Sequence, residues 1–119
     1  MRKVPQDKAV VTVYGGKKIT VNGKPWKEFP HKGGGFLSGF TPELTLEPGE
    51  YTVSGEFITT TNMSRTNVTA KNITLTANLQ AGQRYDIGLF EGSYDLEVAA
   101  ASVQLDRKDW YVILRHLEG

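Results

Sequence analysis

The sequence contains no cysteine, and this absence excludes disulfide bonds, thiolate metal sites and cysteine nucleophiles. Histidine is almost as scarce, because His31 and His116 are the only two in the chain. A multi-histidine metal site within one chain is therefore excluded as well. We accordingly expect neither a metal nor a cofactor.

Long apolar runs are also missing. No segment approaches the about 20 consecutive apolar residues that a membrane-spanning helix needs. The first seven residues, from Met1 to Asp7, lack the apolar stretch of a signal peptide. The sequence therefore predicts no transmembrane segment. It fits either a cytoplasmic chain or the mature part of an exported protein whose signal or lipid anchor was removed.

The chain has almost no net charge, since basic and acidic residues sum to +1, but the two signs are unevenly distributed along it. Residues 1–32 hold eight Lys or Arg and two acidic residues, whereas residues 33–119 hold six and eleven. This asymmetry favours basic strands that lie beside acidic ones, and a basic surface for a polyanion is the alternative. No nucleic-acid-binding signature accompanies the basic part, so we do not expect nucleic acid as a partner.

The patterns that are present are those of β-strands. A length of 119 residues suits one domain, which we expect to cover residues 1–119. Residues 9–14 and 17–21 are β-branched and apolar, and residues 51–61 and 67–79 alternate polar and apolar side chains with a period of two. Residues 96–105 fit a helix or a strand. We choose the strand, because the turn at 107–109 then leads into the apolar run 110–114.

These patterns predict an all-β fold, namely an antiparallel β-sandwich of the Ig-like or transthyretin-like kind with seven to nine strands. No segment has the length and capping residues of a convincing helix. Glycine-containing turns predict hairpins at residues 15–16, 48–49 and 81–82. The side chains expected in the core are Tyr51, Val53, Phe57, Ile73, Leu75, Tyr85 and Ile87.

One turn pattern occurs twice, in residues 46–53 and 79–87, and reads apolar, Pro or small, Gly, Tyr, β-branched. Together with the stretch Ile19-Thr20-Val21-Asn22-Gly23-Lys24, these segments resemble the PEGA-type and related β-sandwich modules of bacterial envelope lipoproteins. The resemblance covers roughly residues 10–90. The long Gly-rich insert at 24–42 departs from the family pattern, and the segment after Phe90 has no counterpart in it.

This resemblance implies a non-enzymatic module of the bacterial cell envelope. Its implied location is the periplasm or the cell surface, while the N-terminal sequence leaves the cytoplasm open. Its implied partner is another envelope protein or domain. Contact with the membrane would then occur only through a removed anchor.

The segment from residue 24 to residue 42 is the longest one without strand periodicity, and it contains Pro25, Pro30, Pro42 and the run 33–35 of glycine. Its aromatic and basic side chains have the composition of a contact surface. The predicted binding residues are Trp26, Phe29, His31, Lys32 and Phe36, with Phe40 as a further ring.

Two other interpretations of this segment remain open. Its rings could cover the open end of the core and contact no partner. Alternatively, the rings could stack on sugars, because aromatic faces bury a large area at low entropic cost. The second alternative makes the protein a carbohydrate-binding or adhesin-like domain.

No residue pattern points to catalysis. His31 could act as an acid or base, but a histidine in a Gly- and Pro-rich loop is more often simply exposed. The glycine run at 33–35 lacks the lysine pattern or following helix of a phosphate-binding loop. The spacing of Asp106 and Asp109 matches no calcium-binding loop. We therefore expect no enzyme and no catalytic residue.

The turn assignment can be tested at Gly49. We expect this residue to have a positive φ, which a β-branched side chain resists. Gly49→Val should lower the free energy of unfolding by roughly 1 kcal/mol or more. Thermal melts of the two proteins measure the loss, and an unchanged melting temperature would refute the assignment.

Overall fold

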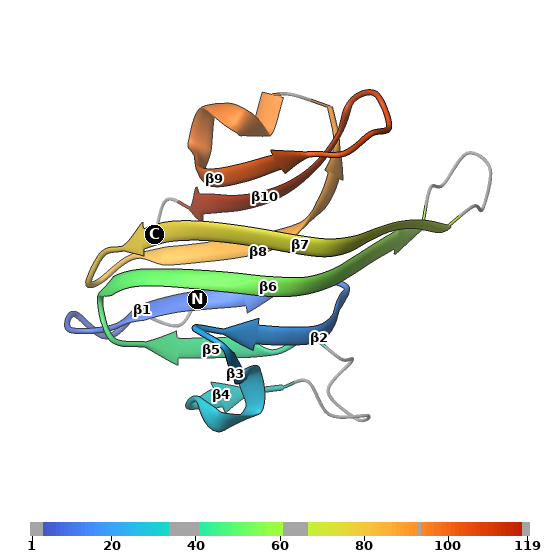
Figure 1. Cartoon of the computed structure of the whole chain (residues 1–119). Coiled ribbons are helices and arrows are strands. Elements are labelled where there is room, and N and C mark those ends of the chain that lie inside the picture. Colours follow the sequence, from blue (N-terminus) through green and yellow to red (C-terminus); the bar gives the residue numbers. More distant parts are fainter. Residues whose placement is uncertain (1–3, 34–40, 61–66, 93, 118–119) are drawn as a thin grey trace.

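The computed structural model describes residues 4–33, 41–60, 67–92 and 94–117, and these residues form two β-sheets. The six-stranded sheet has the order β4-β5-β1-β8-β10-β9, and the four-stranded sheet has the order β3-β2-β6-β7 (Figure 1). In chain order the strands are β1 (Ala9–Val13), β2 (Gly16–Val21), β3 (Lys24–Pro25), β4 (His31–Lys32), β5 (Glu43–Leu46), β6 (Gly49–Thr60), β7 (Asn67–Leu79), β8 (Arg84–Glu91), β9 (Ala99–Gln104) and β10 (Trp110–Leu117).

The only helices in the described ranges are two short 3-10 helices, η1 (Trp26–Glu28) and η3 (Tyr94–Val98). The predicted all-β class is therefore confirmed. Within the same ranges, no helix combines the length and the hydropathy that a membrane crossing requires.

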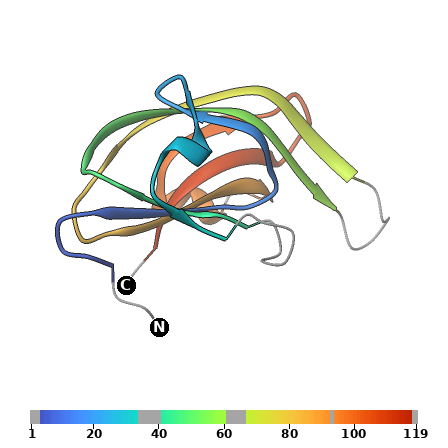
Figure 2. The same cartoon turned by 90° about the horizontal axis from the view of Figure 1, so that it is seen from below.

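The two sheets lie face to face, as Figure 2 shows, and their inner side chains share one apolar core. An apolar cavity of about 10 Å³ lies between them. A space of this size holds at most one water molecule, and an apolar lining keeps it dry. The core members with the least exposure come from both sheets and include Val13, Val21, Leu44, Phe57, Ile87 and Val112.

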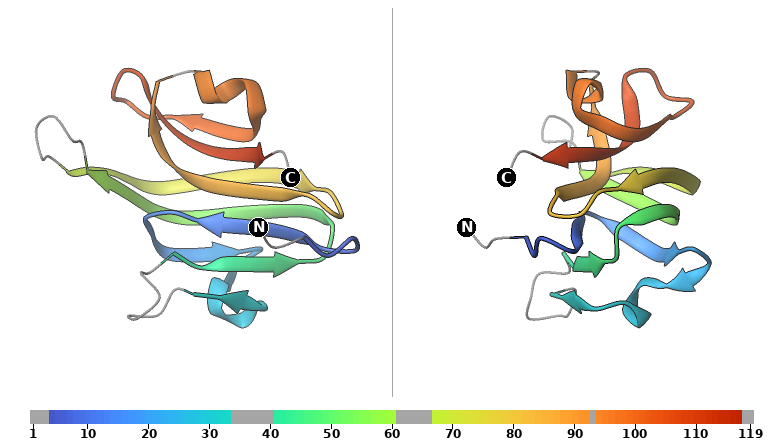
Figure 3. Two further views of the ribbon diagram at one scale, coloured as in Figure 1. Left: turned by 180° about the vertical axis from the view of Figure 1, so that it is seen from behind. Right: turned by 90° about the vertical axis from the view of Figure 1, so that its left-hand side faces the viewer.

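The predicted alternation of buried and wet side chains is confirmed. Val53 and Phe57 on β6, and Ile73 and Leu75 on β7, are buried, as are Tyr85 and Ile87 on β8. Tyr51 is half-buried, because its hydroxyl reaches back to the exposed turn before β6. The strands β6 and β7 form a long ribbon that extends past the other strands (Figure 3).

The hairpins predicted at 15–16, 48–49 and 81–82 are wrong. Each of these turns carries the chain from one sheet to the other: β1 to β2, β5 to β6 and β7 to β8. The predicted positive φ is nevertheless present at Gly49 (+145°) and Gly82 (+77°), whereas in the 15–16 turn Gly15 has it (+62°) and Gly16 does not. A glycine turn reverses the chain but does not decide whether the next strand pairs beside the first or packs opposite it. Here both strands bury their inner faces by lying on opposite sides of the core.

A tyrosine hydroxyl ties two of these crossings to the turn that precedes it. The Tyr51 hydroxyl donates to the backbone oxygen of Glu47 at 2.7 Å. The backbone N–H of Gln80 donates to the Tyr85 hydroxyl at 3.0 Å. The turn pattern that occurs twice in the sequence therefore forms two similar corners, each closed by its own tyrosine.

The antiparallel prediction fails at one strand pair, because β1 runs parallel to β8 with Val11 opposite Tyr85. Parallel neighbours require a long crossover connection. Here the connection is the whole chain from β2 to β7, which local sequence patterns do not reveal. The other strand pairs are antiparallel.

Hairpins do form elsewhere. Asn22 and Gly23, with φ values of 51° and 80°, make the two-residue turn between β2 and β3. The predicted turn at 107–109 joins β9 to β10 and is confirmed, with the Leu105 N–H donating to the Trp110 carbonyl oxygen at 2.9 Å.

Two further predictions need correction. Ten strands are present among the described residues instead of seven to nine, because β3 and β4, of two residues each, add to the sheet edges. The segment 24–42 is thus not wholly irregular. The segment 96–105 begins as the end of η3, and its strand starts at Ala99.

The crossing from β1 to β2 gives a sharp stability test. A Cβ at Gly15 would lie 2.2 Å from the Ile58 carbonyl oxygen, whereas a Cβ at Gly23 would meet nothing within 4 Å. Both glycines have left-handed φ, so Gly23→Ala should cost about 1 kcal/mol from backbone conformation alone.

Gly15→Ala should cost clearly more, at least about 2–3 kcal/mol, because backbone must also move. Urea unfolding of both variants measures the difference. Equal losses would contradict this account of the crossing.

Candidate functional site

The segment from β3 to β4 closes one side of the molecule. β3 adds to the edge of the four-stranded sheet and β4 to the edge of the six-stranded sheet, and η1 lies between them (Figure 1). Proline at positions 25 and 30 suits such edge positions, because proline donates no ladder hydrogen bond. Trp26 and Phe29 pack against the core from this segment.

Two side chains of the segment lie against the Trp26 ring, those of Lys27 and His31. The His31 ring meets it edge to face, with 4.9 Å between ring centroids and 75° between planes. The Lys27 ammonium lies 5.7 Å from the Trp26 centroid, within cation–π range. His31 Nδ1 donates to the Phe29 carbonyl oxygen at 2.7 Å, because a carbonyl can only accept. This bond orients the imidazole and leaves Nε2 as the acceptor nitrogen of the neutral ring.

The predicted site residues fall into three groups. Trp26 and Phe29 are half-buried, while His31 and Lys32 are exposed. Phe36, together with Phe40, lies outside the described residues. The segment therefore covers the core and presents a basic rim at once, so neither of the two simple interpretations describes it completely.

A pocket of about 170 Å³ adjoins this segment. Phe29 and Pro30 form one wall of the pocket, and the facing side chains come from the end of β5, the following turn, the start of β6 and the residue before β1. These facing residues are Lys8, Thr45, Leu46, Glu47 and Tyr51.

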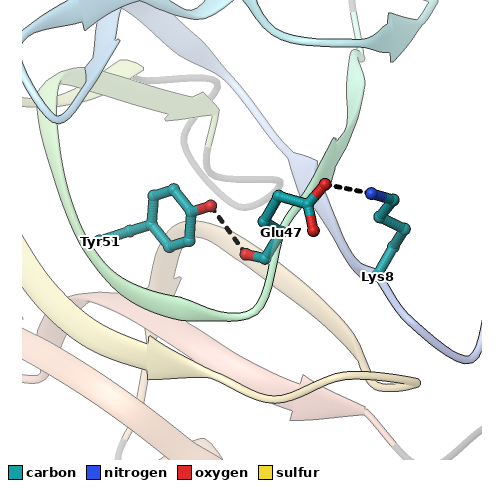
Figure 4. Close-up of polar contacts among 3 residues, drawn as sticks. All are labelled: Lys8, Glu47 and Tyr51. Atoms are coloured by element: carbon teal, nitrogen blue, oxygen red, sulfur yellow. Dashed lines mark hydrogen bonds and ion pairs between the residues drawn. The ribbon is translucent and has the colours of Figure 1, made fainter.

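Polar contacts fix one side of this pocket (Figure 4). The Lys8 ammonium forms an ion pair and hydrogen bond with the Glu47 carboxylate, and the Tyr51 hydroxyl bonds to the Glu47 backbone. The hydrogen bond that the Lys8 ammonium donates to the Glu47 carboxylate raises the pKa of Lys8 above its ordinary value, and burial raises the pKa of Tyr51. At neutral pH Lys8 is therefore charged and the Tyr51 phenol is protonated.

The basic residues in the first quarter of the chain have two kinds of surroundings. Lys8 pairs with Glu47, and Lys17 stands opposite Glu56 on β6. Lys27 and Lys32, in contrast, are exposed on the β3–η1–β4 segment. The Lys8–Glu47 pair agrees with the first alternative, basic strands beside acidic ones, while a polyanion-binding surface stays a prediction.

Sequence reasoning missed Lys8, Glu47 and Tyr51 as parts of a pocket. Tyr51 was expected inside the fold, but nothing in the repeated turn pattern indicates that its ring lines a surface hollow with Phe29. Lys8 and Glu47 belong to segments 39 residues apart in the chain. Across the described residues, no group of three or more His, Cys, Asp or Glu side chains has the arrangement of a metal site.

Compared with known proteins, the chain matches no family model, no curated protein and no solved structure. Function must therefore be inferred from the surface of the chain itself.

The Tyr51 hydrogen bond has a testable pH signature. Burial raises the folded-state pKa of Tyr51 above its ordinary value of 10.0, so unfolding releases this proton at high pH. The stability contributed by the neutral phenol is complete below pH 10.0 and is lost as the pH rises through the folded-state pKa. The raised pKa of Lys8 acts in the same direction.

Tyr51→Phe should therefore cost about 1 kcal/mol at neutral pH, through the lost hydrogen bond, and should show a smaller alkaline loss of stability than the wild type. Urea unfolding between neutral and strongly alkaline pH measures both effects. Tyr14→Phe, at an exposed tyrosine, is the matched control. Parallel stability–pH curves for wild type and Tyr51→Phe would contradict the assignment.

Proposed function

We propose that this protein is a non-enzymatic binding module of the bacterial cell envelope, and that it recognises another envelope protein or domain through the β3–η1–β4 surface. We define this surface by Trp26, Lys27, Phe29, His31 and Lys32. The observation that carries the proposal is the half-buried Trp26 ring with exposed cationic and imidazole side chains around it. Half-buried aromatic anchors with a charged rim are typical of contact surfaces.

The sign of the rim indicates the chemistry of the partner. Lys27 and Lys32 are exposed beside the anchor, and the one acidic residue of this surface segment is Glu28. A partner that offers carboxylates around an apolar contact would complement this field, which mainly raises the association rate and the specificity. The adjoining 170 Å³ pocket, between Phe29 and Tyr51, can receive a side chain of the partner.

The finer fold and the location belong to the same proposal. We infer a β-sandwich of the Ig-like or transthyretin-like kind, supported by two facing sheets around one core. The PEGA-like segments support an envelope location, since they form the β2–β3 hairpin and the two tyrosine-closed corners. Binding residues are disproportionately found on loops that a rigid scaffold positions, as the two sheets position this segment.

Binding to bacterial envelope extract tests the proposal. Immobilised protein should retain a specific component of the extract, and Trp26→Ala should weaken its binding by roughly thirtyfold, as expected for a central aromatic anchor. The double variant Lys27→Glu, Lys32→Glu should weaken binding with the melting temperature nearly unchanged, because both residues are exposed.

Tyr14→Ala, at an exposed aromatic that belongs neither to this surface nor to the adjoining pocket, is the matched control and should bind like the wild type. Equal retention by all four proteins would refute the proposed surface. Retention of a polysaccharide in place of a protein, lost on Trp26→Ala, would move the assignment to the carbohydrate-binding alternative.

A further inference from the structure

Three neighbouring strands have an unusual backbone at the same level of the four-stranded sheet. Lys18 on β2 has φ +56°, Gly55 on β6 has φ +155° and Asn72 on β7 has φ +57°. The strand registers shift at the same places, between β2 and β6 and between β6 and β7. β-Bulges bend a strand and re-aim its side chains, and they are frequent next to functional sites.

The glycine at this level is required by the inner face of the sheet. A Cβ at Gly55 would lie 2.6 Å from Ile19 Cδ1 and 3.1 Å from the Lys17 carbonyl oxygen. Ile19 therefore packs closely against Gly55 on the inner face of the sheet and leaves no room for a side chain there.

The bulged level forms a groove of about 430 Å³ on the outer face of the sheet, the face toward the viewer in Figure 1. The groove is shallow and open to solvent along the sheet face. The groove is lined by Lys18, Thr20, Ser54, Gly55, Glu56, Asn72, Ile73 and Thr74.

Hydroxyl groups stand in register across the groove. Thr20 lies opposite Ser54, and Ser54 lies opposite Thr74, so one row of three hydroxyls crosses three strands. The Ser54 and Thr74 hydroxyl oxygens are 3.2 Å apart. The next row along the strands continues the pattern, with 3.0 Å between the hydroxyl oxygens of Thr52 and Thr76. Each hydroxyl both donates and accepts hydrogen bonds.

From this lining we propose that the groove binds a neutral oligosaccharide. The lining has no aromatic ring, and Lys18, Ser54 and Glu56 belong to residue types that are depleted in protein interfaces, so a protein partner fits it poorly. Its one basic and one acidic residue, Lys18 and Glu56, give no preference for an anion. Hydroxyl, amide, ammonium and carboxylate groups together match the hydroxyls of an uncharged sugar.

This site shares no residue with the β3–η1–β4 surface and lies on the face of the sheet, although Thr20 of the groove pairs with Pro25 of β3 at the adjoining edge. Hydrogen bonds to sugar replace hydrogen bonds to water, so each contributes little net free energy. We therefore expect weak binding, with a dissociation constant on the order of 1 mM.

NMR titration of the full chain with maltohexaose, cellohexaose and chitohexaose at millimolar concentrations tests the site. At least one sugar should shift amide signals, and the shifts should be confined to residues 18–20, 52–56 and 72–76. The double variant Ser54→Ala, Thr74→Val should bind about tenfold more weakly, since it removes two hydroxyls from the row.

Thr69→Val is the matched control, because Thr69 is exposed on the same strand but lies outside the groove. It should bind like the wild type. The single variant Thr74→Val, which keeps the shape of the side chain, replaces the double variant if the latter is not folded.

Three results would overturn the inference: no shifts with any of the three sugars, shifts centred on Trp26 and His31, or undiminished binding by the folded variants. Stronger binding of a charged hexagalacturonate would also overturn it, since the ligand would not be neutral. Trp26→Ala should leave this titration unchanged, so the result is independent of the proposed protein-binding surface.

Discussion

The fold depends on how the chain is held where it crosses between the sheets. Tyr51 and Tyr85 each fasten a crossing to the backbone of the preceding turn. Each bond contributes only about 1 kcal/mol. At one corner β5 of the six-stranded sheet is followed by β6 of the four-stranded sheet, and at the other β7 is followed by β8 of the six-stranded sheet. Both corners lie where the chain passes from one sheet to the other, and the inner side chains of the two sheets share one apolar core.

A second constraint acts on the outer face of the six-stranded sheet. The Arg115 guanidinium on β10 donates two hydrogen bonds, of 2.8 and 2.6 Å, to the buried Asp86 carboxylate on β8. The same guanidinium lies 4.1 Å from the centroid of the Phe90 ring. Asp86 and Arg115 are direct partners in the β8–β10 register. This two-bond arginine–carboxylate pair adds geometric specificity, because moving β10 by one residue along β8 would leave the buried Asp86 carboxylate unpaired. The pair therefore sets the register of the central strands.

The sequence predicts those features of the fold that are local. The period of two in β6 and β7, the reversal at Asn22-Gly23 and the positive φ at Gly49 all follow from neighbouring residues. Pairing between distant segments does not follow, which is why the parallel contact of β1 with β8 and the three sheet crossings were mistaken. The candidate site divides in the same way. The aromatic and basic content of residues 24–32 is readable, whereas the pocket with Lys8, Glu47 and Tyr51 exists only because three separate segments meet.

The parallel contact between β1 and β8 also determines the order in which the chain can be completed. Val10 pairs with Arg84, so the first strand must wait until most of the chain has left the ribosome before it finds its long-range neighbour. The β2–β3 and β6–β7 pairs need only nearby residues, and they can form during that interval. Long-range pairing is slow, because loop-closure entropy is lost before contacts compensate for it. We therefore expect the four-stranded sheet to act as the early template, on which the six-stranded sheet assembles last during synthesis.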